Sequence, residues 1–203
     1  MSLLDDPDAG VSDLEGKAEA IGWLRDLTRS GTYQPRILDV GAGRGTWREL
    51  GPAGLHWTAI EAWHPYVVRF GLAAKYDVVI EGDIRTLDLS RLRPFDVAIL
   101  GDVLEHLGAS TARYVWARVR DVSRFVILSV PLGPYPQGAI AGNPYEVHRS
   151  TWTHADVLGL PGIRVAVAGE RIGVYLADGR PRMTLDPKLV TCSLAVFSPE
   201  EEG

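Results

Sequence analysis

The residues best suited to chemistry lie in a glycine-rich turn, GAGRG at residues 41–45, that directly follows an apolar run ending in Asp39 and Val40. An apolar strand, a glycine turn and a helix in this order make a loop whose backbone can approach a ligand closely, because glycine has no Cβ. The third glycine of a dinucleotide-binding loop would fall at Thr46. The pattern therefore favours a nucleoside without a pyrophosphate, although a structural turn in another α/β protein remains the alternative.

Two acidic residues end the next two apolar runs. Glu61 stands 20 residues after Gly41, where a carboxylate can accept hydrogen bonds from both ribose hydroxyls. Asp83 ends the following run, where its side chain can reach an adenine amino group. The carboxyl ends of parallel strands meet at the edge where open α/β sheets bind ligands. Asp39, Glu61 and Asp83 together therefore predict a nucleoside site at that edge.

Short apolar runs alternate with amphipathic stretches along the chain, which predicts a parallel sheet covered by helices on both faces. Ser12 and Glu15 have capping-box spacing, so a helix is expected to begin at Ser12 and to end near Gly31. Further helices are predicted at Thr46–Leu50, Pro65–Ala74, Ser110–Val122 and Thr153–Leu158. The predicted strands are Arg36–Val40, His56–Ile60, Val78–Glu81, Asp96–Leu100, Phe125–Val130, Ile163–Leu176 and Thr191–Phe197.

The 203 residues suffice for one domain, expected at 12–198 after a flexible leader at 1–11 and before an acidic tail at 199–203. A formal charge of −5 argues against a protein held to nucleic acid by its overall charge. Cys192 is the only cysteine, which excludes an intrachain disulfide and a thiolate zinc cluster. No apolar run approaches the roughly 20 residues that cross a bilayer, so we expect a cytoplasmic protein without membrane contact.

The fourth run continues into GDVLEHL, residues 101–107. Together with the glycine loop, Glu61 and Asp83, it resembles the class I S-adenosylmethionine-dependent methyltransferases, with four motifs in the family's order over residues 35–131. The resemblance implies an α/β fold, a doubly wound Rossmann-like seven-stranded sheet with an antiparallel last strand. It also implies that the helix at 12–31 covers the cofactor, S-adenosyl-L-methionine, and that residues 131–152 form an insert on the acceptor side.

By this resemblance the glycine loop lies against the methionine part of the cofactor, Glu61 binds the ribose and Asp83 holds the adenine. The residues expected to bind the cofactor are Asp39, Gly41, Ala42, Gly43, Gly45, Glu61, Ala62, Trp63, Asp83, Ile84, Gly101 and Asp102. The family motif does not explain a residue as large as Trp47 at the start of the helix that follows the loop.

A hydroxyl acceptor needs a general base near neutrality, and histidine suits that task. His106 follows the fourth strand, His148 lies in the insert, and Glu146 is two residues from His148, so that in an extended segment both side chains point the same way. We predict His106, His148 and Glu146 as the catalytic residues, with hydrogen-bonded structural histidines as the alternative. The same segments also offer metal ligands, but we predict no metal site; the candidate ligands are Asp102, Glu105, His106, Glu146 and His148.

The chain offers no second domain to bind a large partner, so we expect methyl transfer to an oxygen or nitrogen of a small-molecule or glycan-like acceptor. Tyr135, Tyr145 and Trp152 are expected to form its aromatic walls. Three alternatives remain: an RNA or protein methyltransferase, a non-catalytic nucleoside-binding module, and a nicotinamide-dependent dehydrogenase. A stripe of arginines falls mostly at helical spacing and is expected to be a solvated helix face; its members are Arg93, Arg113, Arg118, Arg120 and Arg124.

Overall fold

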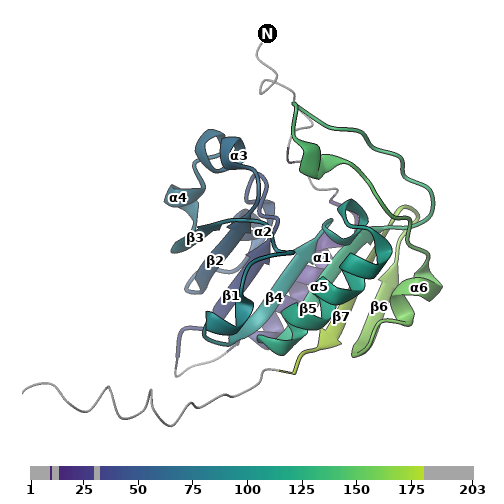
Figure 1. Cartoon of the computed structure of the whole chain (residues 1–203). Helices are drawn as coiled ribbons and strands as arrows, with labels where there is room; N and C mark the ends of the chain where they lie inside the picture. Colours follow the sequence, from purple (N-terminus) through teal and green to yellow (C-terminus); the bar gives the residue numbers. More distant parts are fainter. Residues whose placement is uncertain (1–9, 11–13, 30–32, 181–203) are drawn as a thin grey trace, which may run out of the picture.

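The computed structural model describes Gly10, residues 14–29 and residues 33–180. Over this part of the chain a single sheet has the strand order β3-β2-β1-β4-β5-β7-β6 (Figure 1). The first five strands are parallel, whereas β7 runs antiparallel to β5 and β6 antiparallel to β7. This confirms the predicted doubly wound sheet. The strands are β1 (Arg36–Val40), β2 (His56–Glu61), β3 (Val78–Glu81), β4 (Phe95–Gly101), β5 (Ser123–Pro131), β6 (Ile163–Ala168) and β7 (Ile172–Asp178).

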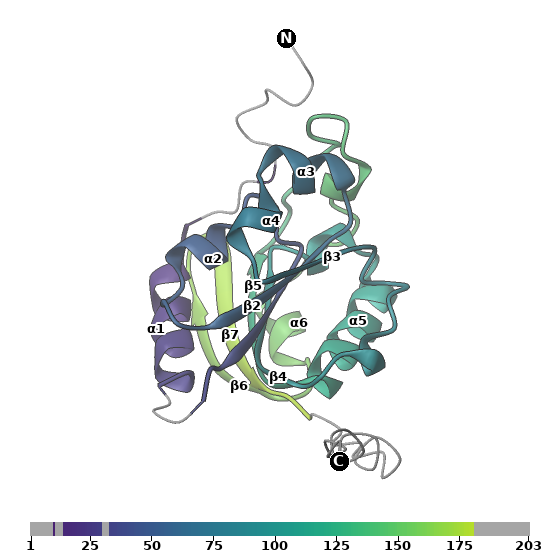
Figure 2. The same cartoon turned by 90° about the vertical axis from the view of Figure 1, so that its left-hand side faces the viewer.

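Helices cover both faces of the sheet, as Figure 2 shows. One face packs against α1 to α4 and the other against α5 and α6. Because both faces are buried, the central strands are almost continuously apolar. The α-helices are α1 (Lys17–Leu27), α2 (Thr46–Leu50), α3 (His64–Arg69), α4 (Leu72–Lys75), α5 (Ala109–Asp121) and α6 (His154–Leu158), and the 3-10 turns are η2 (Leu89–Arg91), η3 (Leu104–His106) and η4 (Pro144–Glu146).

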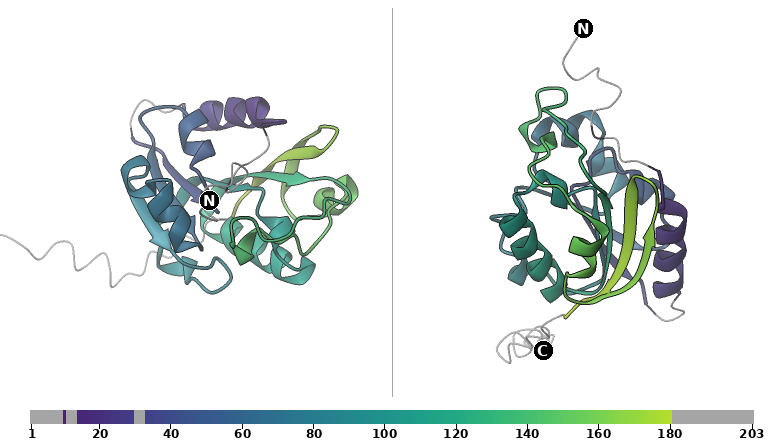
Figure 3. Two further views of the ribbon diagram at one scale, coloured as in Figure 1. Left: turned by 90° about the horizontal axis from the view of Figure 1, so that it is seen from above. Right: turned by 90° about the vertical axis from the view of Figure 1, so that its right-hand side faces the viewer.

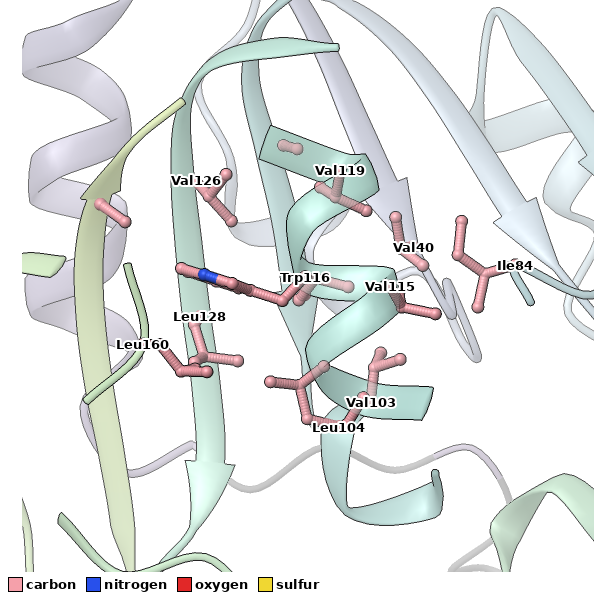
Figure 4. Close-up of a cluster of buried hydrophobic side chains, with 14 of the residues drawn as sticks. Val40, Ile84, Val103, Leu104, Val115, Trp116, Val119, Val126, Leu128 and Leu160 are labelled. Atoms are coloured by element: carbon pink, nitrogen blue, oxygen red, sulfur yellow. The ribbon is translucent and has the colours of Figure 1, made fainter. Parts of the chain in front are cut away.

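The hydrophobic core between α5 and the sheet holds the central strands in position. Val115, Trp116 and Val119 on one face of α5 are fully buried against the sheet, beside Leu128 of β5 (Figure 4). The indole of Trp116 also donates a hydrogen bond to the Pro161 carbonyl, 3.1 Å away. Burying such a stripe against a sheet stabilises a helix far more than its intrinsic propensity does.

The N-terminal helix differs from the prediction. It begins at Lys17 after Gly16, which has a positive φ, and Ser12 lies outside the described residues. The expected capping box involves Ser12 and so lies outside the described residues, while the Glu15 carboxylate accepts the backbone N–H groups of Glu170 and Arg171 between β6 and β7. The helix was expected to cover the cofactor. In the structure it packs on one face of the sheet, against β7 and β4.

The last two strands also differ. The apolar run Ile163–Leu176, predicted as one strand, is the β6–β7 hairpin, and the predicted strand Thr191–Phe197 lies outside the described residues. The chain reverses at residues 169–171, where the Gly169 N–H donates to the Ile172 carbonyl at 2.9 Å. Both hairpin strands are apolar, so the sequence pattern did not separate them.

The segment between β5 and α6 rises above the carboxyl edge of the sheet on the side of α3 (Figures 1 and 3). It holds only the short turn η4 and is tied to the core by bridges from Leu132 and Gly133 to Trp152. It corresponds to the insert predicted at residues 131–152. Among the described helices, none has the length and apolar character of a bilayer-spanning segment.

Candidate functional site

A cavity of about 350 Å³ opens at the carboxyl edge of the sheet, within the size range of small-molecule sites. The ends of β1 to β4 form one side of it and the insert forms the other. Glu61, Asp83, His106, Glu146 and His148 all line it, so the structure brings the predicted cofactor and acceptor sides together. The predicted cofactor residues that line it are Gly41, Ala42, Gly43, Glu61, Ala62, Asp83, Ile84, Gly101 and Asp102.

The glycine loop is held by its own hydrogen bonds. The N–H groups of Gly41 and Ala42 donate to the Ile60 carbonyl, and that of Gly43 donates to the Glu61 carboxylate at 3.0 Å. The remaining two, of Arg44 and Gly45, donate to the carbonyls of Gly10 and Ala42. All five donors of the loop are therefore used within the protein, and a pyrophosphate would find none of them free. This observation argues against a dinucleotide.

Glu61 is buried at the end of β2, with 5% of its surface exposed. Its two carboxylate oxygens accept backbone N–H groups from Gly43 at 3.0 Å and Trp63 at 2.8 Å. Burial raises the pKa of Glu61, while the hydrogen bonds from Trp63 and Gly43 oppose that shift. A carboxylate oxygen can accept more than one hydrogen bond, so each oxygen keeps capacity for a ribose hydroxyl.

Asp83 has a partner that sequence reasoning missed. The guanidinium of Arg85 donates two hydrogen bonds from Nε to its carboxylate, at 2.8 and 2.7 Å, and Nη2 contacts it as well. Although partial burial raises the pKa of Asp83, the bonds from Arg85 lower it overall. Arg85 also lies 5.7 Å from the ring centroid of Tyr145 in the insert. An adenine amino group would therefore share Asp83 with Arg85.

Asp102 has a positive φ of 57°, which is uncommon for a residue with a Cβ. The Ser129 hydroxyl donates to one carboxylate oxygen at 2.7 Å, and Lys17 Nζ lies 3.5 Å from the other. Lys17 is itself only 2% exposed, so α1 contributes a buried cation behind the site. Neither partner was predicted, because both come from segments far from Asp102 in the chain.

The structure explains Trp47. Its indole lies under the end of β4, where a Cβ on Gly101 would overlap the indole nitrogen. Trp47 is 2% exposed yet lines the cavity, and its Nε1 has no hydrogen-bond partner. Gly101 is therefore a glycine for steric reasons, and the two residues together form the floor of the cavity.

Three predicted cofactor residues do not line the cavity. Asp39 is fully buried behind the loop, where the Tyr76 hydroxyl donates to it at 2.5 Å. Gly45 caps α2 with a positive φ, and Trp63 contributes the N–H that binds Glu61. These residues hold the loop and the acidic side chain in place, so in this structure they support the site. Trp152, predicted as an acceptor wall, is 2% exposed and lies outside the cavity.

His106 and His148 face each other, with ring centroids 4.7 Å apart. Burial, followed by the repulsive charge of His148, lowers the pKa of His106 to about 4. Burial also lowers the pKa of His148, while the Tyr135 carbonyl that its Nδ1 contacts opposes the shift. Both imidazoles are therefore neutral at physiological pH and offer nitrogen lone pairs.

Glu146 and His148 both line this cavity, although the segment at Glu146 is a 3-10 turn and not the extended segment assumed from the i, i+2 spacing. It lies in the turn η4, where Tyr66 Oη donates to its carboxylate at 2.9 Å and Gln137 Nε2 at 3.2 Å. Burial raises the pKa of Glu146 despite these hydrogen bonds. With both oxygens engaged, Glu146 joins the insert to α3.

Known structures share this architecture. The N-terminal domain of EvdMO1, solved with S-adenosylhomocysteine and D-fucose, superposes with a TM-score of 0.61 at 16% identity, over 84% of this chain and 85% of that one. Magnesium protoporphyrin IX methyltransferase from Synechocystis PCC 6803 with bound S-adenosylmethionine gives 0.58 at 17% identity, over 80% and 77% of the two chains. The chain has the class I methyltransferase fold.

A third structure with this methyltransferase fold, the complex of DhpI with S-adenosylhomocysteine, has a TM-score of 0.60 at 17% identity and covers 82% of this chain and 87% of that one. No protein-family model matches the sequence, and a search of curated proteins finds no similar sequence. The fold therefore rests on the sheet order and these superpositions, and the activity must be argued from the cavity.

Proposed function

We propose that this protein binds S-adenosyl-L-methionine in the cavity and transfers its methyl group to an oxygen or nitrogen of a small-molecule or glycan-like acceptor. The observation that carries the proposal is the arrangement of one continuous cavity. Glu61 and Asp83 stand at its nucleoside side, and the neutral pair His106 and His148 stands at the insert side. EvdMO1 was crystallised with S-adenosylhomocysteine and D-fucose together, which supports a sugar-like acceptor.

The cofactor's parts match the groups that line the cavity. Glu61 would accept the ribose hydroxyls, and Asp83 with Ile84 would bind the adenine edge. A side chain at Gly41 or Gly43 would meet Val103 at 2.9 Å or the Gly10 carbonyl at 3.0 Å, and both glycines have a positive φ. Both positions are therefore restricted to glycine, and Asp102, which lines the cavity beside the loop, would bind the amino-acid part of the cofactor.

S-Adenosylmethionine supplies a methyl group on a positively charged sulfur: as the new bond to the acceptor forms, the carbon–sulfur bond breaks and neutral S-adenosylhomocysteine is left. The protein must align the acceptor, exclude water and take the acceptor's proton. Alignment alone can contribute on the order of 7–11 kcal/mol to lowering the barrier in favourable cases. In the proposed reaction the neutral imidazoles of His106 and His148, which line the cavity, would take the proton.

Calorimetric titration with S-adenosylmethionine, S-adenosylhomocysteine and NAD tests the cofactor. We expect micromolar binding of the two sulfur ligands and none of NAD. Glu61→Ala should weaken binding at least tenfold, because it removes the acceptor of the ribose hydroxyls. Glu49→Ala, at an exposed carboxylate of α2 that pairs with Lys75 outside the cavity, should bind as the wild type does. Binding of NAD alone would instead support a dehydrogenase.

Release of S-adenosylhomocysteine then tests turnover against hydroxylated acceptors, beginning with D-fucose and related sugars. Turnover with one of them would establish the enzyme. A protein that binds the cofactor but methylates no sugar, phenol, amine, RNA or protein offered to it would be a nucleoside-binding module. An acceptor found only among RNAs or proteins would move the function to the macromolecular alternative.

A further inference from the structure

The insert side of the cavity holds a cluster of potential metal ligands from two separate segments. Glu105 and His106 come from the turn η3 after β4, and His148 comes from the insert. One ligand atom from each of these residues lies within 4.8 Å of the other two. Both backbone N–H groups of Arg149 and Ser150 donate to the Glu105 carbonyl, at 2.7 and 3.0 Å, and so join the two segments at the cluster.

Two buried polar atoms in this cluster lack a hydrogen-bond partner among the residues that the structure describes. Glu105 lines the cavity and is only 2% exposed. Its carboxylate oxygen Oε2 is one of the two atoms without a hydrogen-bond partner. Nδ1 of His106 is also buried and without one. Buried polar atoms are nearly always satisfied in folded proteins. A cation between these side chains would satisfy both atoms at once.

The tautomer of His148 leaves a ring nitrogen lone pair available to bind a cation. Its Nδ1 contacts the carbonyl oxygen of Tyr135, and a carbonyl can only accept, so Nδ1 carries the proton. The lone pair of His148 is therefore on Nε2. A histidine that donates its other ring N–H to a backbone carbonyl is the usual arrangement at metal sites, because that bond fixes the ring and the tautomer.

The other nearby carboxylates are already engaged. Asp102 accepts from Ser129 and pairs with Lys17, and Glu146 accepts from Tyr66 and Gln137. Glu105 is therefore the carboxylate that remains for a cation. Ligand atoms that share a tetrahedral ion at about 2 Å lie roughly 3.3 Å apart, so the cluster would have to contract by about 1.5 Å at its widest.

We propose that Glu105, His106 and His148 bind a divalent transition-metal cation, in contrast to the metal-free site expected from the sequence. One carboxylate and two imidazoles suit zinc, iron or cobalt better than magnesium, which prefers oxygen ligands. Three protein ligands leave a coordination position open to the cavity. This inference rests on the proposed function: within it, the open coordination position would bind an acceptor through a hydroxyl oxygen.

Coordination would occupy the imidazole lone pairs that otherwise take the acceptor's proton, so the two roles of the histidines exclude each other. With the cation bound, the acceptor hydroxyl would lose its proton to solvent. Its oxygen would then form the bond to the methyl carbon as the carbon–sulfur bond breaks.

The experiment titrates tag-free, chelator-treated full-length protein with Co²⁺ and follows its visible absorption, with Zn²⁺ titration by calorimetry alongside. We expect one ion per chain for the wild type. His148→Ala and Glu105→Gln should weaken binding at least tenfold. His64→Ala should bind as the wild type does, since this exposed histidine pairs with Glu81 outside the cavity.

Near-ultraviolet circular dichroism shows whether each variant is folded, and His148→Ala, at a partly exposed residue, keeps the test open if Glu105→Gln fails to fold. Absence of stoichiometric Co²⁺ and Zn²⁺ binding to the folded wild type would overturn the proposal. Equal binding by folded His148→Ala would do the same, and displacement of Co²⁺ by equimolar Mg²⁺ would refute the transition-metal assignment. The metal titration contains no S-adenosylmethionine. A protein that binds the metal but not the cofactor would therefore contradict the proposed function and leave the metal site intact.

Discussion

At the scale of single residues, Asp39 couples the glycine loop to the stability of the protein. Burial raises the pKa of its carboxyl from 3.8 to about 7, although the hydrogen bond from Tyr76 opposes the shift. The folded protein therefore keeps this proton at pH values where the unfolded chain has released it. The associated stability is fully present below pH 3.8, falls as the pH rises towards the folded pKa and is lost above it.

Asp39→Asn should remove this pH dependence, because the amide does not titrate but can still accept from Tyr76. We expect the free energy of unfolding of the wild type, relative to the variant, to fall between about pH 4 and pH 8, by about 4 kcal/mol at most. Urea denaturation at several pH values measures it. Asp26→Asn, at an exposed residue of α1, is the control, and a wild-type curve parallel to that of Asp39→Asn would contradict the assignment.

The same residue shows what sequence can and cannot predict at this scale. Asp39 was predicted to bind the cofactor, but it lies outside the cavity, and its partner Tyr76, 37 residues away in the chain, was not predicted. Lys17 and Ser129 were missed for the same reason, whereas Arg85 stands only two residues from Asp83 and was missed because spacing does not show that its side chain folds back onto that carboxylate. Motif spacing reports which residues stand at strand ends, whereas the side chains that contact them are set by tertiary packing.

At the scale of elements, the insert is held over the cavity by few contacts. Glu146 accepts from Tyr66 on α3 and from Gln137 within the insert, and His148 N–H donates to the Gln137 carbonyl at 3.0 Å. A segment with so little regular structure depends on each such bond. Tyr66 thus links α3 to the insert across the edge of the cavity.

Tyr66→Phe should loosen the insert. Removing the hydroxyl leaves a carboxylate oxygen of Glu146 without that donor, at a cost of about 1 kcal/mol. We expect faster amide hydrogen exchange over residues 135–148 with unchanged protection in α5, measured by mass spectrometry. Tyr114→Phe, on the exposed face of α5, is the matched control. Uniform loss of protection across the whole chain would show that Tyr66 stabilises the fold rather than the insert.

The strands were predicted correctly where a glycine or an acidic residue interrupts the apolar pattern, and wrongly where the apolar pattern continues through a turn. A glycine or an acidic residue ends or directly follows each of the first four strands, so β1 to β4 were located to within a residue of their ends. The β6–β7 hairpin is apolar on both strands and reverses over three residues, so it was predicted as one strand. The helix start at Ser12 was wrong: the helix begins at Lys17, after Gly16 with its positive φ, and the Ser12–Glu15 spacing does not encode that conformation.

At the scale of the whole molecule, the distribution of charge favours a small acceptor over RNA. The net charge is −5, and three of the five arginines of the predicted stripe bind carbonyl or carboxylate groups of the fold. Arg118 donates to the Ile84 carbonyl at 3.1 Å and Arg120 to the Asp178 carbonyl at 2.7 Å, with Arg120 only 5% exposed. Arg124 pairs with Asp96 at 3.5 Å. Among the described residues, α5 therefore offers no continuous row of unpaired cations to a phosphate backbone, since its third arginine, Arg113, lies over the Trp152 ring at 5.7 Å.

We accordingly expect no appreciable affinity for labelled single- or double-stranded RNA in fluorescence anisotropy at about 50 mM salt, where phosphate contacts are strongest. Competing RNA should also leave methyl transfer to a small acceptor unchanged. A protein that neutralised several phosphates would bind at low salt and lose affinity by orders of magnitude near 200 mM. Such a salt-dependent complex would contradict the prediction and locate a cationic surface elsewhere on the protein, because the α5 arginines already have partners in the fold.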